Sequence, residues 1–267
     1  MGTTSAPSPQ QKRFAAYLDG LAQAAGHADR NSPLRSYCIG LLLPGERKSV
    51  EPMAARLSPE RVRQMHQSLH HLVADAPWSD EAVLDRALDF VLPAMLARGP
   101  VVAWVVDDTG FPKKGMHSVG VARQYCGQIG KQENCRVAVS LSVTTETSSM
   151  PVAFRLYLPE VWANDSEKRE RTGVPAELPF RTKPEIALAQ IRRARERGIP
   201  DGVVLADAGY GNGTEFRTAL TKLELRWNCA MWSASRARQP FGSPARDRNR
   251  RLRTKGPDDR HACWKRR

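Results

Sequence analysis

The hydrophobic pattern of this 267-residue chain changes at Pro100, and that change limits the fold more than any other feature. Residues 11–98 carry apolar side chains at helical spacing, with helix-start signals at Ser58 and Ser79. Short strand-like runs follow, and then helical patterns alternate with strands: the strands 101–106, 136–144, 152–158 and 201–207, and the helices 183–198 and 213–227. We therefore predict an α/β protein in which a helical N-terminal region precedes a mixed sheet with flanking helices.

The end of the chain has neither a helical nor a strand period. After Asn228 the sequence is rich in Arg, Pro and Gly, and it holds twelve Lys and Arg against three Asp and Glu, so it carries most of the net charge of +13. We predict three regions: 1–99, helical; 100–230, the sheet domain; and 231–267, a basic disordered tail. The abrupt change suggests out-of-frame translation of a GC-rich gene, and a basic tail that binds nucleic acid is the alternative.

Composition narrows the functional classes. No apolar run reaches the 18 or so residues of a membrane span, and the N-terminus lacks the apolar core of a signal peptide. Five scattered cysteines without a CxxC pair argue against a disulfide framework and a structural zinc site. We expect a cytoplasmic protein, without membrane contact, whose basic charge favours a polyanionic partner.

Acidic residues follow two of the predicted strands. Asp107 and Asp108 end the apolar run in "VVAWVVDDTGFPKKG", and Asp207 ends the run in "DGVVLADAGYG". Ligands of α/β sheets gather at strand ends, and carboxylates from neighbouring strands suit a hydrated Mg²⁺ ion. Each Asp taken alone is more often a turn or N-cap residue. Together they form a candidate site for metal-dependent phosphodiester chemistry.

Three separated blocks resemble the catalytic domain of bacterial insertion-sequence transposases of the DDE class: "VVDDTGFPKKGMHSVGVARQYCGQIGKQENCRVAVSLSV", "YLPEVWANDSEKRERTGVPAELPFRTKPEIAL" and "VLADAGYGNGTEFRTAL". The resemblance implies a ribonuclease H-like fold, a catalytic Asp-Asp-Glu triad, and Mg²⁺ or Mn²⁺ as cofactor. It assigns the first metal ligand to Asp108, with Asp107 as the fallback, and the second to Asp207. It also implies DNA cleavage and strand transfer at transposon ends, with double-stranded DNA as partner and a homodimer as a further hypothesis.

The third carboxylate of that triad has no counterpart in this sequence. Glu215 and Glu224 follow Asp207 too closely, and Asp258 and Asp259 lie in the aberrant tail. We therefore expect a truncated or frame-shifted transposase remnant that is inactive alone, because two ligands hold and position a metal less well than three.

Four basic residues between the first strands are candidate contacts for DNA phosphates: Lys113, Lys114, Arg123 and Lys131. An ordinary solvated surface is an equal alternative. The helix at 58–75 carries Arg61 and Arg63 and is a weaker candidate for a helix-turn-helix.

Two other functions remain open. A non-catalytic fragment that only binds DNA is the stronger alternative. A haloacid-dehalogenase-like phosphatase is weaker, because the acids of that class are spaced DxDx[TV] and here they are adjacent. His66, His70 and His71 lack the HExxH pattern of a zinc site, and we assign them to a structural helix.

Overall fold

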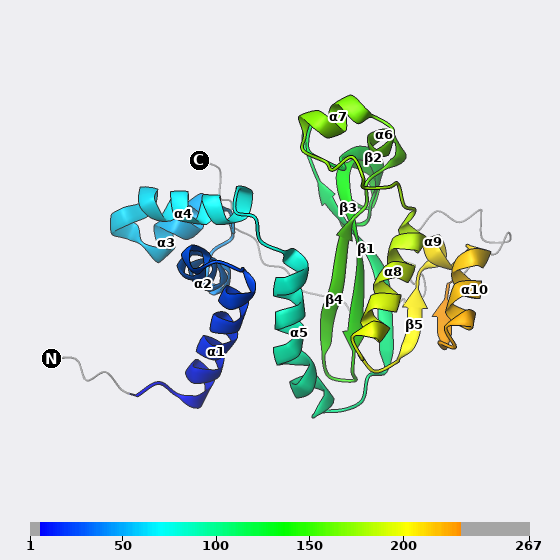
Figure 1. Ribbon diagram of the computed structural model, residues 1–267, viewed down its shortest axis with the longest axis horizontal. Helices are drawn as coiled ribbons and strands as arrows, with labels where there is room; N and C mark the ends of the chain where they lie inside the picture. Colours follow the sequence, from blue (N-terminus) through cyan, green and yellow to red (C-terminus); the bar gives the residue numbers. More distant parts are fainter. Residues whose placement is uncertain (1–5, 231–267) are drawn as a thin grey trace, which may run out of the picture. The chain divides into compact units, whose positions relative to one another are not determined.

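The computed structural model describes residues 6–230, so the basic tail predicted at 231–267 lies outside the described residues. All described residues belong to one compact unit. Helices form its first part, and a sheet forms the framework of its second part (Figure 1). Within the described part, no helix combines the length and apolar character that a membrane crossing requires.

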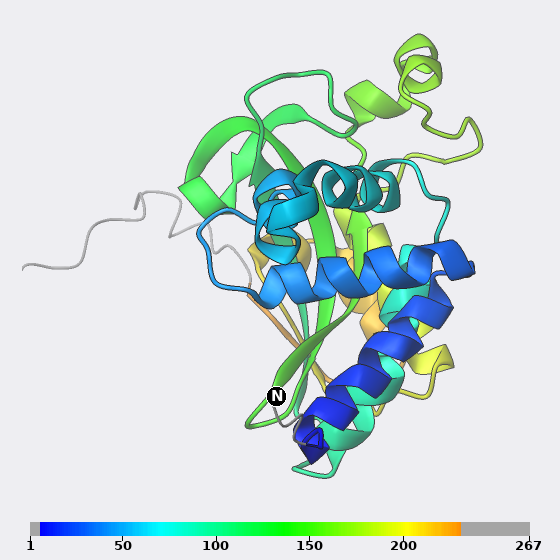
Figure 2. The same cartoon turned by 90° about the vertical axis from the view of Figure 1, so that its left-hand side faces the viewer.

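The N-terminal region consists of five α-helices and one 3₁₀ turn: α1 (Pro9–Ala24), α2 (Ala28–Leu42), α3 (Val50–Leu57), η1 (Pro59–Arg61), α4 (Val62–Ala74) and α5 (Asp80–Leu96). Ser8 opens α1 with a capping box, and Ser79 caps α5 through the backbone N–H of Ala82. Helix α1 runs along α5 (Figure 2). The rings of Tyr17 and Phe90 meet edge to face between these two helices. The predicted helical region is therefore confirmed.

The second part is a six-stranded mixed sheet with short and long helices between its strands: β1 (Ala103–Pro112), β2 (Ala122–Cys126), η2 (Gly127–Ile129), β3 (Lys131–Thr144), β4 (Ser149–Leu156), α6 (Glu160–Ala163), α7 (Ser166–Arg171), α8 (Lys183–Glu196), β5 (Val203–Ala206), α9 (Ala208–Gly211), α10 (Thr214–Lys222) and β6 (Trp227–Cys229). The strand order is β2-β3-β1-β5-β6, and β4 also pairs with β3. Strand β3 is antiparallel to β1, whereas β5 is parallel to β1 and β6 is parallel to β5. This architecture is consistent with the ribonuclease H-like fold that the sequence predicted.

One face of the sheet carries the main hydrophobic core. Trp104 and Val106 on β1 and alternate residues of β3 from Val137 to Val143 are buried there. In the described part, α5, α8 and α10 all contribute side chains to this core. Successive strand residues point to opposite faces, so Asp107, Thr109 and Phe111 project from the other face, and all three are exposed.

Ion pairs connect the N-terminal region to the sheet domain across the helix pair α5 and α8. Asp85 of α5 forms an ion pair with Arg193 of α8 at 3.0 Å and also pairs with Arg197, the residue that follows α8 as its C-cap. Glu81 binds Arg193 at 2.6 Å, and Asp89 binds Arg197 at 3.3 Å. The acidic face of α5 therefore neutralises the basic face of α8.

Two sheet predictions need correction. Strand β1 does not end before the acids, because its pairing with β3 continues past them to Pro112. Strand β2 has no counterpart among the predicted strands, and it places Arg123 in a strand, while Lys131 begins the next one. Its sequence, ARQYC, does not alternate between apolar and polar residues and therefore gives no strand signal.

The contact between α9 and β6 predicts a glycine requirement. A Cβ atom on Gly211 would collide with the carbonyl oxygen of Ala230 and would lie 2.9 Å from the Cβ of Cys229. We expect Gly211→Ala to lower the free energy of unfolding by about 1 to 3 kcal/mol, the usual cost of overpacking. Urea denaturation measures this change. Gly127→Ala is the control because its Cβ would meet no atom within 4 Å, and an equal loss in both variants would contradict the assignment.

Candidate functional site

The acidic residues that follow β1 and β5 are brought together by parallel pairing. Val106 aligns with Ala206 in the β1–β5 register, so the next residue in each strand is an aspartate, Asp107 or Asp207. Beyond this point the two chains differ. Strand β1 continues beside β3, whereas Asp207 becomes the N-cap of α9. The sheet therefore places Asp107, Asp108 and Asp207 where the parallel pairing of β1 with β5 ends.

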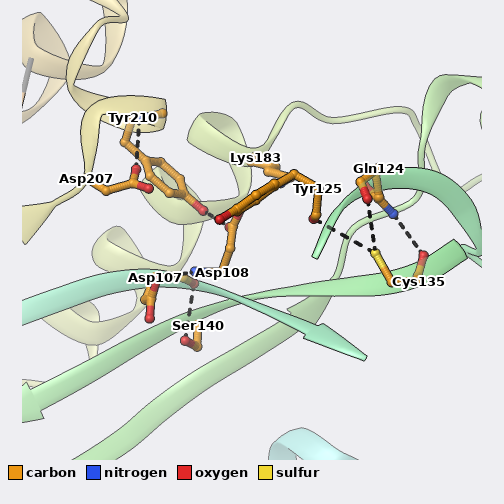
Figure 3. Close-up of polar contacts among 10 residues, drawn as sticks. Asp107, Asp108, Gln124, Tyr125, Cys135, Ser140, Lys183, Asp207 and Tyr210 are labelled. Carbon is orange, nitrogen blue, oxygen red and sulfur yellow. Dashed lines mark hydrogen bonds and ion pairs between the residues drawn. The ribbon is translucent and has the colours of Figure 1, made fainter. Parts of the chain in front are cut away.

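Asp108 points into the face of the sheet that α8 covers, and both of its carboxylate oxygens have partners. Lys183 Nζ lies 2.5 Å from Oδ2, and the Tyr210 hydroxyl donates a short hydrogen bond to Oδ1. Both partners belong to the α8 and α9 side of the sheet, and Figure 3 shows Asp108 and Asp207 on that side of β1 with Tyr210 between them. Asp108 and Lys183 keep 29% and 31% of their side-chain surface exposed, so solvent ions can reach the pair.

Asp107 points to the opposite face of β1 (Figure 3). Its Oδ1 accepts a hydrogen bond from the backbone N–H of Asp108 at 2.8 Å, and its backbone oxygen accepts one from Ser140 Oγ at 3.3 Å. The structure therefore groups Asp108, rather than the fallback Asp107, with Asp207 and the residues of α8.

Tyr210 connects the two acids. Its ring is buried against Phe216, and Asp207 fixes the turn before it by accepting the N–H of Gly209 at 2.9 Å. Burial is the main cause that raises the pKa of the Tyr210 phenol, followed by the charge of Asp108 and the hydrogen bond to it. The charges of Asp207 and Asp107 raise this pKa further.

Lys183 is held at the first position of α8. Thr182 caps the helix by accepting the N–H of Glu185, whose carboxylate in turn accepts the N–H of Thr182. This fixed helix start directs the Lys183 side chain towards β1, where its ammonium group also lies 5.5 Å from the centre of the Tyr157 ring. A cation at a helix N-terminus opposes the helix dipole, so the pairing with Asp108 compensates for an unfavourable position.

The donor set suits a divalent ion that keeps most of its water. Asp108 and Asp207 offer hard oxygen ligands, and the ammonium group against Asp108 shows that a cation is accommodated beside this carboxylate. Among residues 6–230, however, no three His, Cys, Asp or Glu side chains are grouped to hold a metal. His66 and His70 stack with ring centres 6.0 Å apart, and they belong to no such group either.

The predicted DNA contacts lie away from these acids. Lys113 and Lys114 follow the end of β1, Arg123 lies in β2, and Lys131 begins β3, and all four are exposed. In the described part of the chain, no hydrogen bond or ion pair links these four residues to Asp108 or Asp207. Whether they contact DNA stays a prediction.

Sequence reasoning missed Lys183 and Tyr210. Tyr210 lies three residues after Asp207 in the motif DAGYG, but the sequence does not show that its hydroxyl binds Asp108. Lys183 gave a weaker signal, which is a basic residue at the start of a capped helix where an acidic one is favoured.

The fold and the carboxylates define the class first: a ribonuclease H-like protein with acidic residues where two parallel strands meet. The chain belongs to the DDE superfamily endonucleases, whose sequence profile matches residues 19–266. It is similar to a curated protein of Microchaete diplosiphon described as a probable transposase for insertion sequence element IS701. The two are 34% identical over 168 residues, which cover 62% of this chain and 41% of the relative. The chain thus spans less than half the length of that relative. Endonucleases of this family generally depend on divalent metal ions.

The raised pKa of Tyr210 predicts an alkaline loss of stability. In the folded chain the phenol keeps its proton, whereas in the unfolded chain it ionises above about pH 10, so its contribution is complete below that pH and is lost above it. We expect the free energy of unfolding of Tyr210→Phe to fall less steeply with pH than that of the unmodified chain between about pH 9.5 and 11. Urea denaturation at several pH values measures this slope. Tyr125→Phe changes a hydroxyl on an exposed ring and is the control. Equal alkaline slopes in all three proteins would contradict the burial of the Tyr210 phenol.

Proposed function

We propose that this chain carries the catalytic framework of an insertion-sequence transposase, which acts by metal-dependent phosphodiester cleavage and strand transfer at transposon ends. Asp108 and Asp207 would hold the divalent ion, Mg²⁺ or Mn²⁺. The observation that carries the proposal is the β1–β5 register, which brings Asp207 to the strand ends beside Asp107 and Asp108, where the Tyr210 hydroxyl binds Asp108. Membership of the DDE superfamily endonucleases supports it.

Each residue of the site has a defined task in this proposal. The ion, when bound, supplies activation of a water or 3′ hydroxyl and stabilisation of the leaving oxygen. Asp108 and Asp207 bind and orient it. Tyr210 donates to Asp108 Oδ1, which fixes the rotation of that carboxylate and leaves Oδ2 directed towards Lys183.

The third carboxylate of the family has no candidate beside Asp108 in the described residues. Glu215 lies in the first turn of α10 and is exposed, and Glu224 follows α10 with a positive φ of 56°. Asp258 and Asp259 lie outside the described residues. Two protein ligands position an ion less firmly than three, so we propose that a site made of Asp108 and Asp207 alone cleaves DNA weakly or not at all.

A second candidate function follows from that shortage of ligands. The chain would bind DNA at transposon ends without cutting it, because Lys183 already neutralises Asp108 and no third ligand joins the described pair. The exposed cations at Lys113, Lys114, Arg123 and Lys131 would then supply sequence-independent affinity for the DNA backbone.

A nicking assay on supercoiled DNA with Mg²⁺ or Mn²⁺ separates these functions. We expect Asp108→Asn and Asp207→Asn each to lower any metal-dependent nicking at least about 100-fold, because each replaces a charged carboxylate ligand of the ion by a neutral amide. DNA binding should persist in both variants. Asp107→Asn is the matched control because its side chain lies on the other face of β1, and it should nick at the unmodified rate.

The nicking assay, together with measurements of DNA binding and of phosphomonoester hydrolysis, separates the candidate functions. Nicking that survives Asp108→Asn or Asp207→Asn would refute the metal assignment. DNA binding without any nicking in the unmodified chain would favour the second function. Hydrolysis of a phosphomonoester that depends on Asp108 would favour a phosphatase instead.

The charge of the chain's end yields another prediction. Residues 231–267 hold twelve Lys and Arg and three Asp and Glu. We expect their deletion to weaken binding to random-sequence duplex DNA and to reduce its salt dependence, because fewer counterions are released. Fluorescence anisotropy at several salt concentrations measures both effects. An unchanged salt slope would show that the cations of this segment do not contact DNA.

A further inference from the structure

The Asp108 carboxylate already has a cation in the place where a metal ion would bind. Lys183 Nζ lies 2.5 Å from Oδ2, and the Tyr210 hydroxyl occupies Oδ1. Both oxygens are therefore engaged before any ion arrives. A divalent ion that coordinates Oδ2 would bring two positive charges against a third at contact distance, which is strongly repulsive in a partly buried site.

The Lys183 side chain has a conformational freedom that Tyr210 lacks. Its ammonium group is at the end of a flexible four-carbon chain and the residue is about one third exposed, whereas α8 is held by its own capping box. The ring of Tyr157, 5.5 Å away, offers a neighbouring surface that a cation favours. Tyr210 has no such freedom, because its ring is buried. The two partners of Asp108 thus differ: one is fixed and the other can be displaced.

We propose that Lys183 is the resident counter-ion of Asp108, that a divalent ion must displace it, and that metal binding thereby frees its ammonium group for a DNA phosphate. The inference rests on the proposed function in that it takes Asp108 as a metal ligand. It makes Lys183 a positioning residue that lowers metal affinity in the absence of DNA and couples metal binding to DNA binding.

Mn²⁺ binding to the full chain, followed by electron paramagnetic resonance of the free ion, tests the competition. We expect Lys183→Met to tighten Mn²⁺ binding about fivefold to tenfold, since it removes one partly exposed charge beside the ligand. Lys183→Arg keeps the charge and should bind Mn²⁺ within about twofold of the unmodified chain. Lys222→Met, on the exposed end of α10, is the matched control and should change nothing.

The same titration distinguishes failure of this inference from failure of the proposed function. If Asp108→Asn leaves Mn²⁺ affinity unchanged, Asp108 is not a metal ligand and both proposals fall. If Asp108→Asn weakens Mn²⁺ binding but Lys183→Met leaves it unchanged or weakens it, the metal assignment stands and the counter-ion role is wrong.

A second measurement uses the unmodified chain and therefore does not depend on the folding of any variant. Acetylation of lysine amines by a soluble acetylating reagent, read by mass spectrometry, should modify Lys183 faster when Mn²⁺ is present, because the ion pair with Asp108 is broken. Lys222 should react at the same rate with and without Mn²⁺. An unchanged or slower rate at Lys183 would overturn the displacement step.

The coupling to DNA has its own test. Anisotropy with a short fluorescein-labelled duplex should show that Mn²⁺ raises DNA affinity of the unmodified chain, and that Lys183→Met removes most of this increase while Lys222→Met retains it. A Mn²⁺-dependent increase that survives Lys183→Met, or that is absent from the unmodified chain, would show that the freed ammonium group does not bind the DNA backbone.

Discussion

The parallel pairing of β1 with β5 is the constraint on which the site depends. Hydrogen bonds between the strands align Val106 with Ala206, and this register alone decides which residues meet at the strand ends. A shift by one residue would turn Asp108 towards the opposite face, because successive side chains of a strand alternate. The register is itself held by burial, since Trp104 and Val204 are aligned and both are fully buried in the main core. The apolar half of each strand therefore specifies where its acidic end lies.

Ion pairs occur at both ends of α8, and they differ in how they relate to the helix dipole. At the C-terminal end, Arg193 and the C-cap residue Arg197 pair with the acids of α5, and the helix dipole also favours cations there. At its first residue, Lys183 opposes that dipole and meets Asp108. The first arrangement follows local electrostatic preference and joins two parts of the fold. The second contradicts it, and a position that is locally unfavourable but paired with an acidic site is where function is expected to override local preference.

Sequence reasoning predicted the helical first part and the succession of the main strands and helices after it, because the apolar patterns of β3 and α8 are strong signals. It also singled out Asp108 and Asp207 as candidate ligands, since each follows an apolar run, and their metal role stays a prediction. It could not find the extent of β1, which depends on pairing with β3 beyond Asp107, or the strand β2, which has no apolar alternation. Lys183 and Tyr210 escaped for a related reason: their partner Asp108 is 75 and 102 residues away, and no local pattern encodes a distant contact.

The arrangement around Asp108 has a consequence for how this carboxylate is accommodated in the folded chain. A partly buried carboxylate without a partner is costly, and in the described residues no group of three acidic, His or Cys side chains that could hold a metal includes Asp108. Lys183 offsets this cost with an ion pair and Tyr210 with a hydrogen bond, so the Asp108 carboxylate has partners without a metal ion. These two contacts therefore serve the folded state rather than catalysis. The acids are satisfied in the resting chain by its own side chains, and any divalent ion has to compete with a neighbour that the sequence has placed there.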